Sequence, residues 1–345
     1  MRTPLCEKLG IDYPILQAAI GAAACPALAA AVSNAGGLGT LGLTGWGGEG
    51  AKQLIDETRG LTNRGFTTNV VLAYDVAAEI DAMLAEKPKL VSFFWGDPAP
   101  YVERVHQAGS LLMLTVGSVE EAKAAVDAGV DIIVAQGWEA GGHVRGTVST
   151  LALVPAVVDA IDPVPVVAAG GISDGRGLAA VLSLGAQAAW IGTRFLASAE
   201  ANTHRAYRAK VLAASTADTH YSALFDGGWP DAPGRVIRTP TVEVWERAGR
   251  PERGERVGEG DVIAKDEEGN PVYRFDASTP RREHEGDIEA FPLWAGQGVG
   301  LVTREQSAAD IVSEIVEQAR EVLKAGALLS GTLERPSLDR PTARR

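Results

Sequence analysis

The residue best suited to chemistry in this chain is His143, which follows Gly141 and Gly142 in a loop behind the apolar run Ile132–Ala135. An imidazole titrates near neutral pH, so it can accept or donate a proton or bind a developing anion. Glu139, in the same loop, either orients the imidazole or is an ordinary solvated carboxylate. The pattern predicts a catalytic histidine at the end of a buried strand.

Metal chemistry is not indicated by the remaining histidines and cysteines. None of the histidines forms a metal-ligand spacing with His143, and the cysteines give neither a zinc motif nor a disulfide framework. These residues are His106, His204, His220, His284, Cys6 and Cys25. The chain also lacks a serine nucleophile motif, a P-loop and a catalytic-cysteine motif. We therefore expect no metal ion in the site.

Three carboxamides occur in or directly after apolar runs of the chain. Gln17 belongs to the first run, Asn69 to the third, and Gln136 directly follows the sixth. A carboxamide offers both a donor and an acceptor, so it can bind the edge of a heteroaromatic ring. The alternative for each is that the side chain only caps its own loop.

Two glycine-bearing turns end neighbouring apolar runs. Gly170-Gly171 ends the run Val166–Ala169, and Gly192-Thr193 ends the run Ala188–Ile191, with a helical pattern between them. Glycine lets the backbone approach a ligand, and exposed N–H groups at such turns suit a phosphate. The sequence predicts a phosphate site here; the alternative is that the glycines only make tight turns.

Eight apolar runs, each followed by a helical pattern, position these residues. The predicted strands are Ile11–Ala18, Leu38–Leu41, Phe66–Leu72, Leu90–Phe94, Leu111–Val116, Ile132–Ala135, Val166–Ala169 and Ala188–Ile191. Nearly continuous apolar runs are typical of buried parallel strands. Their number and order predict an α/β fold, the TIM (β/α)8 barrel, in which active sites lie at the C-terminal ends of the strands. A doubly wound sheet is the alternative fold.

The pattern changes after the predicted barrel. Residues 222–287, called the insertion below, are rich in glycine, proline and charge, with alternating stretches at Val242–Trp245 and Val272–Phe275. A turn at 268–271 predicts a β-hairpin or an extended excursion. We expect a mixed insertion that forms a lid or a subunit contact. Its nearby tryptophans either line a pocket or anchor it to the barrel, namely Trp229, Trp245 and Trp294.

The predicted domain organisation follows from this change. Residues 1–221 and 288–330 form the barrel with a C-terminal helix at Ser307–Leu323, whose apolar positions share one face. Residues 331–345 are expected to be a loose tail.

Composition limits the partners. The 345 residues are 46% hydrophobic and 22% charged, as in ordinary globular proteins. A net charge of -12 argues against nucleic acid or anionic membrane as a main partner. The N-terminus lacks the apolar segment of a secretory signal, and no apolar run reaches membrane-spanning length. We expect a cytoplasmic protein with a small-molecule partner; a homo-oligomer is left open.

Six segments together resemble a known family, the FMN-dependent nitronate monooxygenases, formerly called 2-nitropropane dioxygenases. The resemblance runs from about Pro14 to Arg320 and excludes most of the insertion. The segments are Pro14–Gly21, Asn34–Gly39, Gln136–His143, Ala168–Ser173, Gly185–Leu196 and Ala295–Gly300. One departure is that Ala19-Ile20 stands where the family usually has Pro-Met, which alters the surface expected beside the flavin.

The resemblance implies a TIM barrel with one non-covalent FMN. The FMN phosphate would lie on the backbone of Gly170, Gly171, Gly192 and Thr193, and the flavin ring would lie beside the Ala18–Ile20 backbone. The implied cofactor contacts are Ala18, Ala19, Ile20, Asn69, Gln136, Gly141, Gly142, Gly170, Gly171, Gly192 and Thr193. His143 matches the catalytic histidine of the family.

The implied reaction is the oxidation of alkyl nitronates with molecular oxygen to a carbonyl compound and nitrite. His143 would act as a base or as a polar partner of the nitro group. The main alternative is an FMN-dependent enoyl-ACP reductase of the second type, which shares the barrel and a similar histidine loop and uses NAD(P)H. Two further alternatives are a non-enzymatic flavin-binding barrel and a phosphosugar isomerase-type barrel without flavin.

Overall fold

Eight parallel strands form the centre of the computed structural model, which describes residues 1–329. Their order is β1-β9-β8-β6-β5-β4-β3-β2. The two end strands are joined through Leu38, whose N–H donates to Ile15 O and whose carbonyl accepts from Gln17 N, both at 2.9 Å. The strands are β1 (Ile15–Gln17), β2 (Thr40–Gly42), β3 (Thr67–Val71), β4 (Leu90–Phe94), β5 (Leu111–Val116), β6 (Ile132–Gln136), β8 (Val166–Ala169) and β9 (Ala188–Ile191).

This arrangement confirms the predicted TIM barrel. Four predicted strands have the predicted bounds, namely Leu90–Phe94, Leu111–Val116, Val166–Ala169 and Ala188–Ile191. The first is shorter than predicted, because the N–H groups of Asp12 and Tyr13 donate instead to the Gly36 carbonyl. The predicted tail, residues 331–345, lies outside the described residues.

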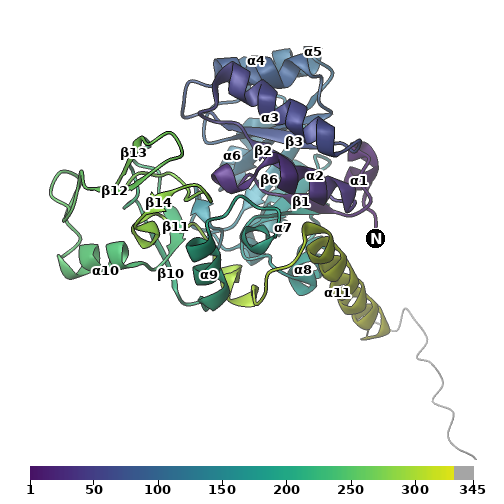
Figure 1. Ribbon diagram of the computed structural model, residues 1–345. Helices are drawn as coiled ribbons and strands as arrows, with labels where there is room; N and C mark the ends of the chain where they lie inside the picture. The colour runs from purple at the N-terminus through teal and green to yellow at the C-terminus, as the bar shows by residue number, and fades with distance from the viewer. Residues whose placement is uncertain (330–345) are drawn as a thin grey trace, which may run out of the picture.

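Helices surround the barrel, and their apolar faces pack on the outward side chains of the strands (Figure 1). They are α2 (Pro26–Asn34), α3 (Gly47–Leu61), α4 (Ala77–Ala85), α5 (Ala99–Gln107), α6 (Val119–Asp127), α7 (Thr150–Ile161) and α8 (Gly175–Ser183). The C-terminal helix α11 (Ala308–Leu329) packs against α8 and α2. None of the helices within residues 1–329 is long and apolar enough to cross a membrane.

A short helix that the sequence analysis did not predict, α1 (Pro4–Leu9), closes one end of the barrel interior. Thr3 caps it by accepting a hydrogen bond from Cys6 N at 3.3 Å. Leu5, Cys6 and Leu9 pack against the inward side chains of the strands. Because α1 fills the N-terminal end, the opposite end is the one left for ligands.

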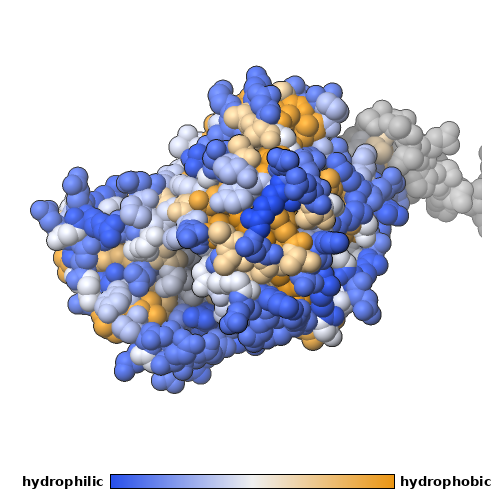
Figure 2. Space-filling view, turned by 90° about the horizontal axis from the view of Figure 1, so that it is seen from above, coloured by the Kyte–Doolittle hydropathy of each residue, from blue (hydrophilic) through white to orange (hydrophobic). Residues whose placement is uncertain are grey.

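The chain after β9 builds a second layer beside the barrel mouth, drawn in green at the left of Figure 1. It includes η2 (Thr193–Ala197), α9 (Arg205–Ala213), β10 (Thr219–Ser222), β11 (Gly234–Ile237), α10 (Pro240–Arg247), β12 (Val262–Lys265), β13 (Pro271–Tyr273), β14 (Glu285–Gly286), η3 (Ile288–Ala290) and η4 (Gln297–Leu301). Strands β12 and β13 pair antiparallel, so the predicted hairpin is confirmed. Hydrophilic residues cover most of the face seen from above (Figure 2).

The alternating stretch Val242–Trp245 lies in the helix α10 and not in a strand. Pro240 occupies the first turn, where its missing N–H costs nothing. Val242 and Trp245 are three residues apart, so they also share one helix face, and both belong to the apolar cluster of the insertion. The short stretch therefore fitted both periodicities.

Candidate active site

A cavity of about 1130 Å³ opens at the C-terminal ends of the barrel strands and is bordered by the insertion. Sites for one drug-sized ligand are about 300–1,000 Å³, so this cavity has room for a cofactor and a second molecule. His143 and the eleven implied cofactor contacts all line this cavity. The fold thus brings the predicted site together, although their individual roles stay predictions.

The loop that carries His143 is held by the chain beyond the barrel. Gly142 and His143 form a two-residue strand, β7, which pairs antiparallel with β11. Gly234 lies opposite His143, and Arg235 lies opposite Gly142. The position of the histidine therefore depends on residues about ninety positions later in the sequence, which no local pattern could reveal.

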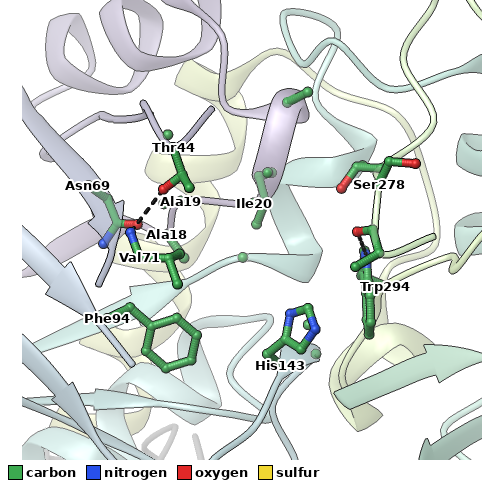
Figure 3. A pocket seen from close by; sticks show the side chains of 18 of the residues that line it. Ala18, Ala19, Ile20, Thr44, Asn69, Val71, Phe94, His143, Ser278 and Trp294 are labelled. Atoms are coloured by element: carbon green, nitrogen blue, oxygen red, sulfur yellow. Dashed lines mark hydrogen bonds between the residues drawn. The ribbon is translucent and has the colours of Figure 1, made fainter. Parts of the chain in front are cut away.

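The His143 imidazole lies between two indole rings. Its centroid is 4.0 Å from that of Trp229 and 4.6 Å from that of Trp294. Its Nε2 is buried and has no hydrogen-bond partner among residues 1–329. Burial lowers the pKa of His143 from its usual 6.5 to about 3. The side chain is therefore a neutral imidazole at physiological pH, with its ring directed into the cavity (Figure 3).

The three tryptophans singled out in the sequence have different positions. Trp229 and Trp294 line the cavity, whereas Trp245 is not among the lining residues. The Trp245 indole donates to Pro251 O at 2.9 Å and packs against His220, which anchors the insertion. Both alternatives from the sequence analysis thus occur, at different residues.

Arg235 ties β11 to the loop after β6, and the sequence analysis did not select it. Its guanidinium donates to Trp138 O at 2.9 and 3.3 Å and to Thr219 Oγ1 at 3.3 Å. It also lies 4.4 Å from the Trp138 ring centroid. The residue is only 2% exposed, and burial lowers the pKa of its guanidinium. The sequence signal for it was weak, an arginine directly before the apolar pair Val236-Ile237.

Gln136 holds the histidine loop. Its Nε2 donates to His143 O at 3.0 Å, and its Oε1 accepts from Arg145 N at 3.4 Å. This is the loop-capping alternative considered for it, although the residue also lines the cavity. Asn69 lines the cavity on the side of Phe94 and donates to Ser92 O at 3.2 Å (Figure 3).

Gln17 and Glu139 are structural. The Gln17 side chain is fully buried, and its Oε1 accepts from Thr40 N at 2.9 Å, which joins β1 to β2. The Glu139 carboxylate accepts from Thr150 N at 2.8 Å and from Thr150 Oγ1 at 3.1 Å. The hypothesis that Glu139 orients His143 was therefore wrong, because this carboxylate instead binds the first residue of α7.

The two glycine turns form a cradle that larger residues would fill. Gly170 and Gly171 have φ of +105° and +72°, which side-chain-bearing residues rarely adopt. A Cβ at Gly170 would lie 2.9 Å from Thr150 Oγ1, and one at Gly192 would lie 2.9 Å from Ile20 Cγ2. The backbone N–H groups of Gly170 and Gly171 donate to no acceptor within residues 1–329. This geometry fits a phosphate.

Ser173 adds a polar group to the cradle that was not selected from the sequence. The cap of α8 is Asp174, whose Oδ1 accepts from Arg176 N at 3.0 Å, so Ser173 is not needed there. The buried Ser173 Oγ has no partner within the described part of the chain and lines the cavity. Ser173 and Asp174 are adjacent, and either residue type could cap α8. Because one cap is enough, this pair was the sequence signal that one of the two side chains is free to bind a ligand.

The comparison with known families decides the identity. A family model described as nitronate monooxygenase matches residues 2–86 and 73–318.

The chain belongs to the nitronate monooxygenase family.

Three individual similarities have different functional names. The nitronate monooxygenase of Paraburkholderia phytofirmans is 39% identical over 65% of this chain and 74% of its own length. The "(3aS,4S,5R,7aS)-5-hydroxy-7a-methyl-1-oxo-octahydro-1H-indene-4-carboxyl-CoA dehydrogenase" of Rhodococcus jostii is 36% identical over 72% of this chain and 69% of its own length. The solved structure of FabK from Thermotoga maritima has a TM-score of 0.82 at 32% identity, covering 96% of this chain and all of that one.

Membership of the nitronate monooxygenase family identifies the chain as an oxidoreductase. Two alternatives from the sequence analysis are therefore corrected, namely the non-enzymatic flavin-binding barrel and the phosphosugar isomerase. Within residues 1–329 no group of three potential metal ligands occurs.

The other histidines are placed as follows. His284 lines the cavity, but its Nδ1 accepts from Arg281 N at 2.8 Å. His106, His204 and His220 do not line it. His143 thus differs from them in combining a place in the cavity with an Nε2 that is fully buried and has no partner within residues 1–329.

Proposed function

We propose that this chain binds one FMN and uses molecular oxygen to convert alkyl nitronates into a carbonyl compound and nitrite. The observation that carries the proposal is the unpartnered Nε2 of His143. This nitrogen belongs to a ring that lies between the indoles of Trp229 and Trp294, in the cavity that the glycine cradle also lines. A buried polar atom without a partner is costly, and its place in a cavity indicates that a ligand supplies the partner.

The residues present fit FMN. The N–H groups of the glycine cradle and the Ser173 hydroxyl would hold the phosphate, and the backbone at Ala18–Ile20 would lie beside the ring. Asn69 offers a carboxamide near Ala18 and Ala19, on the same side of the cavity as Phe94 (Figure 3). When bound, FMN supplies two-electron oxidation and the reaction with oxygen.

His143 binds and orients the substrate in this proposal. Its pKa of about 3 makes it a poor base at neutral pH, so it does not remove the α-proton of a neutral nitroalkane efficiently. A nitronate has already lost that proton. The neutral imidazole can donate an N–H to a nitronate oxygen, and the low dielectric of the indole box strengthens that hydrogen bond. Of the two roles inferred from the family, the polar partner is therefore favoured over the base.

The proposal is tested by comparing nitroethane with its nitronate. Nitrite release and oxygen uptake are measured with FMN-loaded protein, using freshly dissolved nitroethane and pre-ionised ethylnitronate. We expect kcat/KM for the nitronate to exceed that for nitroethane by about 100-fold, the size of a general-base contribution. Equal rates would show that His143 acts as a base, and nitrite release from neither compound would contradict the proposed reaction.

A second candidate is favoured by cavity volume and by one relative. The similarity to a carboxyl-CoA dehydrogenase and the volume of about 1130 Å³ support flavin-dependent hydride transfer to or from an acyl thioester, as in the enoyl-ACP reductase alternative. Rapid anaerobic bleaching of the flavin by NADH or NADPH, with none by nitronates, would support this candidate.

We also propose a cytoplasmic location. Cys6 is buried and Cys25 half-buried, and neither is in a disulfide within the described residues. Free thiols are typical of reducing compartments. Localisation of a tagged chain by cell fractionation tests this.

A further inference from the structure

The part of the cavity next to His143 has an aromatic wall. Tyr74 and Phe94 follow or end barrel strands, and Trp229 reaches them from the insertion. The ring centroids of Tyr74 and Trp229 are 5.4 Å apart, and those of Phe94 and Trp229 are 6.3 Å apart, both edge to face. Rings held at such angles leave flat apolar surfaces against which another flat group can pack.

The rim of the same cavity is acidic. Its lining carboxylates are Asp75, Asp266, Glu267, Glu268 and Asp276. Among the described residues of the lining, Arg281 is the one arginine or lysine. Its guanidinium is 4.0 Å from Glu267 and 6.0 Å from the Trp46 ring centroid, so its charge is already shared.

Two of the lining carboxylates, Asp266 and Asp276, are held in place by hydrogen bonds. The Asp266 carboxylate accepts from Asn270 N at 2.8 Å and from Asn270 Nδ2 at 3.0 Å. Hydrogen bonding by Asn270 lowers the pKa of Asp266. The Asp276 carboxylate likewise accepts from Tyr273 N at 2.9 Å. A substrate that enters the cavity therefore passes several fixed negative charges.

We infer that the cavity selects a nitronate whose remaining body is flat, apolar and uncharged, and that it rejects substrates with additional negative charge. The inference rests on the proposed function and names the substrate class of the same site. Two unit charges 4 Å apart interact by about 1 kcal/mol in water and by more near a protein surface, so each further anionic group on a substrate is disfavoured at this rim. The phosphates of an acyl-CoA or of NADPH would meet the same repulsion.

The rejected class includes the carriers of the second candidate function. An acyl-CoA, an acyl-carrier protein and NADPH all present phosphate groups, and phosphate sites normally use arginine, lysine or a helix N-terminus. The rim offers one shared arginine against five carboxylates. The single charge of a nitronate is tolerated in this proposal, because His143 Nε2 is buried whereas Asp75, Glu267 and Glu268 are exposed, so a nitronate bound to His143 would lie away from them.

The test compares three nitronates that differ in the body attached to the reacting group. Rates of anaerobic flavin reduction are measured with the nitronates of 2-phenylnitroethane, nitroethane and 3-nitropropionate, the last of which is a dianion. We expect kred/Kd to fall in that order, with about a tenfold gap between the first and the last at low salt, from stacking and charge together. Raising NaCl from about 20 to about 300 mM should speed the dianion most, because screening shortens the range of repulsion.

Two variants test the contributions of the aromatic wall and of the acidic rim separately. Trp229→Leu should remove most of the aryl preference. The double variant Glu267→Gln/Glu268→Gln should raise kred/Kd for the dianion about threefold to tenfold and leave the aryl nitronate nearly unchanged. Its matched control is Glu252→Gln/Glu255→Gln, which removes the same charge from exposed positions of the insertion outside the cavity.

Each outcome decides between the proposals. If the dianion reacts as fast as the aryl nitronate at low salt, or slows as salt is added, the substrate class is wrong while nitronate oxidation stands. If the double variant and its control raise the dianion rate equally, the net charge of the protein and not the rim is responsible, and the inference fails. If no nitronate reduces the flavin, both proposals fall.

Discussion

The two sides of the cavity contribute different kinds of residue. On the barrel side, the predicted cofactor contacts are mostly small residues, with Gly170, Gly171, Gly192 and the Ala18–Ile20 segment exposing backbone, and the rings of Tyr74 and Phe94 add to the aromatic wall. The insertion side is made of large aromatic and acidic residues, with Trp229 in the wall and the hairpin turn in the rim. Exposed backbone suits a cofactor that must be held in one place, whereas side chains can be varied to choose a substrate.

The two sides meet at the histidine. His143 belongs to the barrel by sequence, but its strand β7 pairs with β11 and its ring lies against Trp229 and Trp294. The difference between the sides implies a division of labour. Changes on the barrel side should abolish cofactor binding, and changes on the insertion side should alter turnover while the cofactor stays bound.

The largest effect is expected from Gly170→Ala on the barrel side. The residue has φ of +105°, and its Cβ would lie 2.9 Å from both Gly137 O and Thr150 Oγ1. Strain of about 2–3 kcal/mol should weaken FMN binding about 100-fold. Quenching of FMN fluorescence on titration into apoprotein measures this. Gly249→Ala is the matched control, because Gly249 has φ of +86° with no atom within 4 Å of its Cβ and lies in the insertion. Equal FMN affinity in both variants would contradict the assignment of the cradle.

A large loss of turnover with FMN retained is expected from His143→Asn. Among residues 1–329, His143 Nε2 is the one fully buried ring nitrogen of the lining that has no hydrogen-bond partner, and loss of the imidazole should lower kcat/KM for ethylnitronate about 100-fold. In the unaltered protein this rate should be constant between about pH 6 and pH 9, since the pKa of His143 is about 3. A rate that falls with a midpoint near pH 6.5 would show that the imidazole is not buried as described.

The next effect is on acid stability. Folding lowers the pKa of His143 from 6.5 to about 3, so the unfolded chain binds a proton in this window and the folded chain does not. Keeping the buried imidazole neutral therefore does not lower the free energy of unfolding above pH 6.5. Below that pH it lowers the free energy of unfolding progressively as the pH falls toward 3. At pH 5 the cost is about 2 kcal/mol, or 1.36 kcal/mol for each pH unit below the unfolded pKa. Urea unfolding at pH 7 and pH 5 should show that His143→Asn loses less stability on acidification than the unaltered protein.

A smaller effect is expected from Arg235→Met, which keeps volume but removes the ties to Trp138. Leaving that carbonyl unpaired should cost about 1–3 kcal/mol of stability and lower kcat about tenfold, with FMN affinity unchanged. Because Arg235 acts by positioning the His143 strand, the looser ring should also gain water and titrate, giving a pH-dependent rate below pH 6. Arg253→Met, at an exposed position of the insertion, is the control. A loss of kcat without any change in the pH profile would indicate only general destabilisation.

The barrel was predictable because each strand is a local apolar run followed by an amphipathic helix, as at Leu111–Val116. The cavity residues were predictable because they lie in the loops after those strands, as His143 and Gly170 do. The environment of His143 was not, since Trp229, Gly234 and Trp294 come from parts of the chain whose pairing leaves no local pattern. The Ser173 hydroxyl was not selected, because a serine just before a helix is equally typical of a helix cap. The partner of Glu139 was not predictable, because a loop carboxylate can orient a histidine, stay solvated or bind the start of a helix.

The central claim is that the cavity holds FMN where a nitronate can reach it beside His143. It is tested most directly by mixing FMN-loaded protein anaerobically with ethylnitronate and, separately, with NADPH in a stopped-flow spectrophotometer. We expect ethylnitronate to bleach the flavin absorbance and NADPH to leave it oxidised on the same timescale. Rapid bleaching by NADPH with none by the nitronate would contradict the claim.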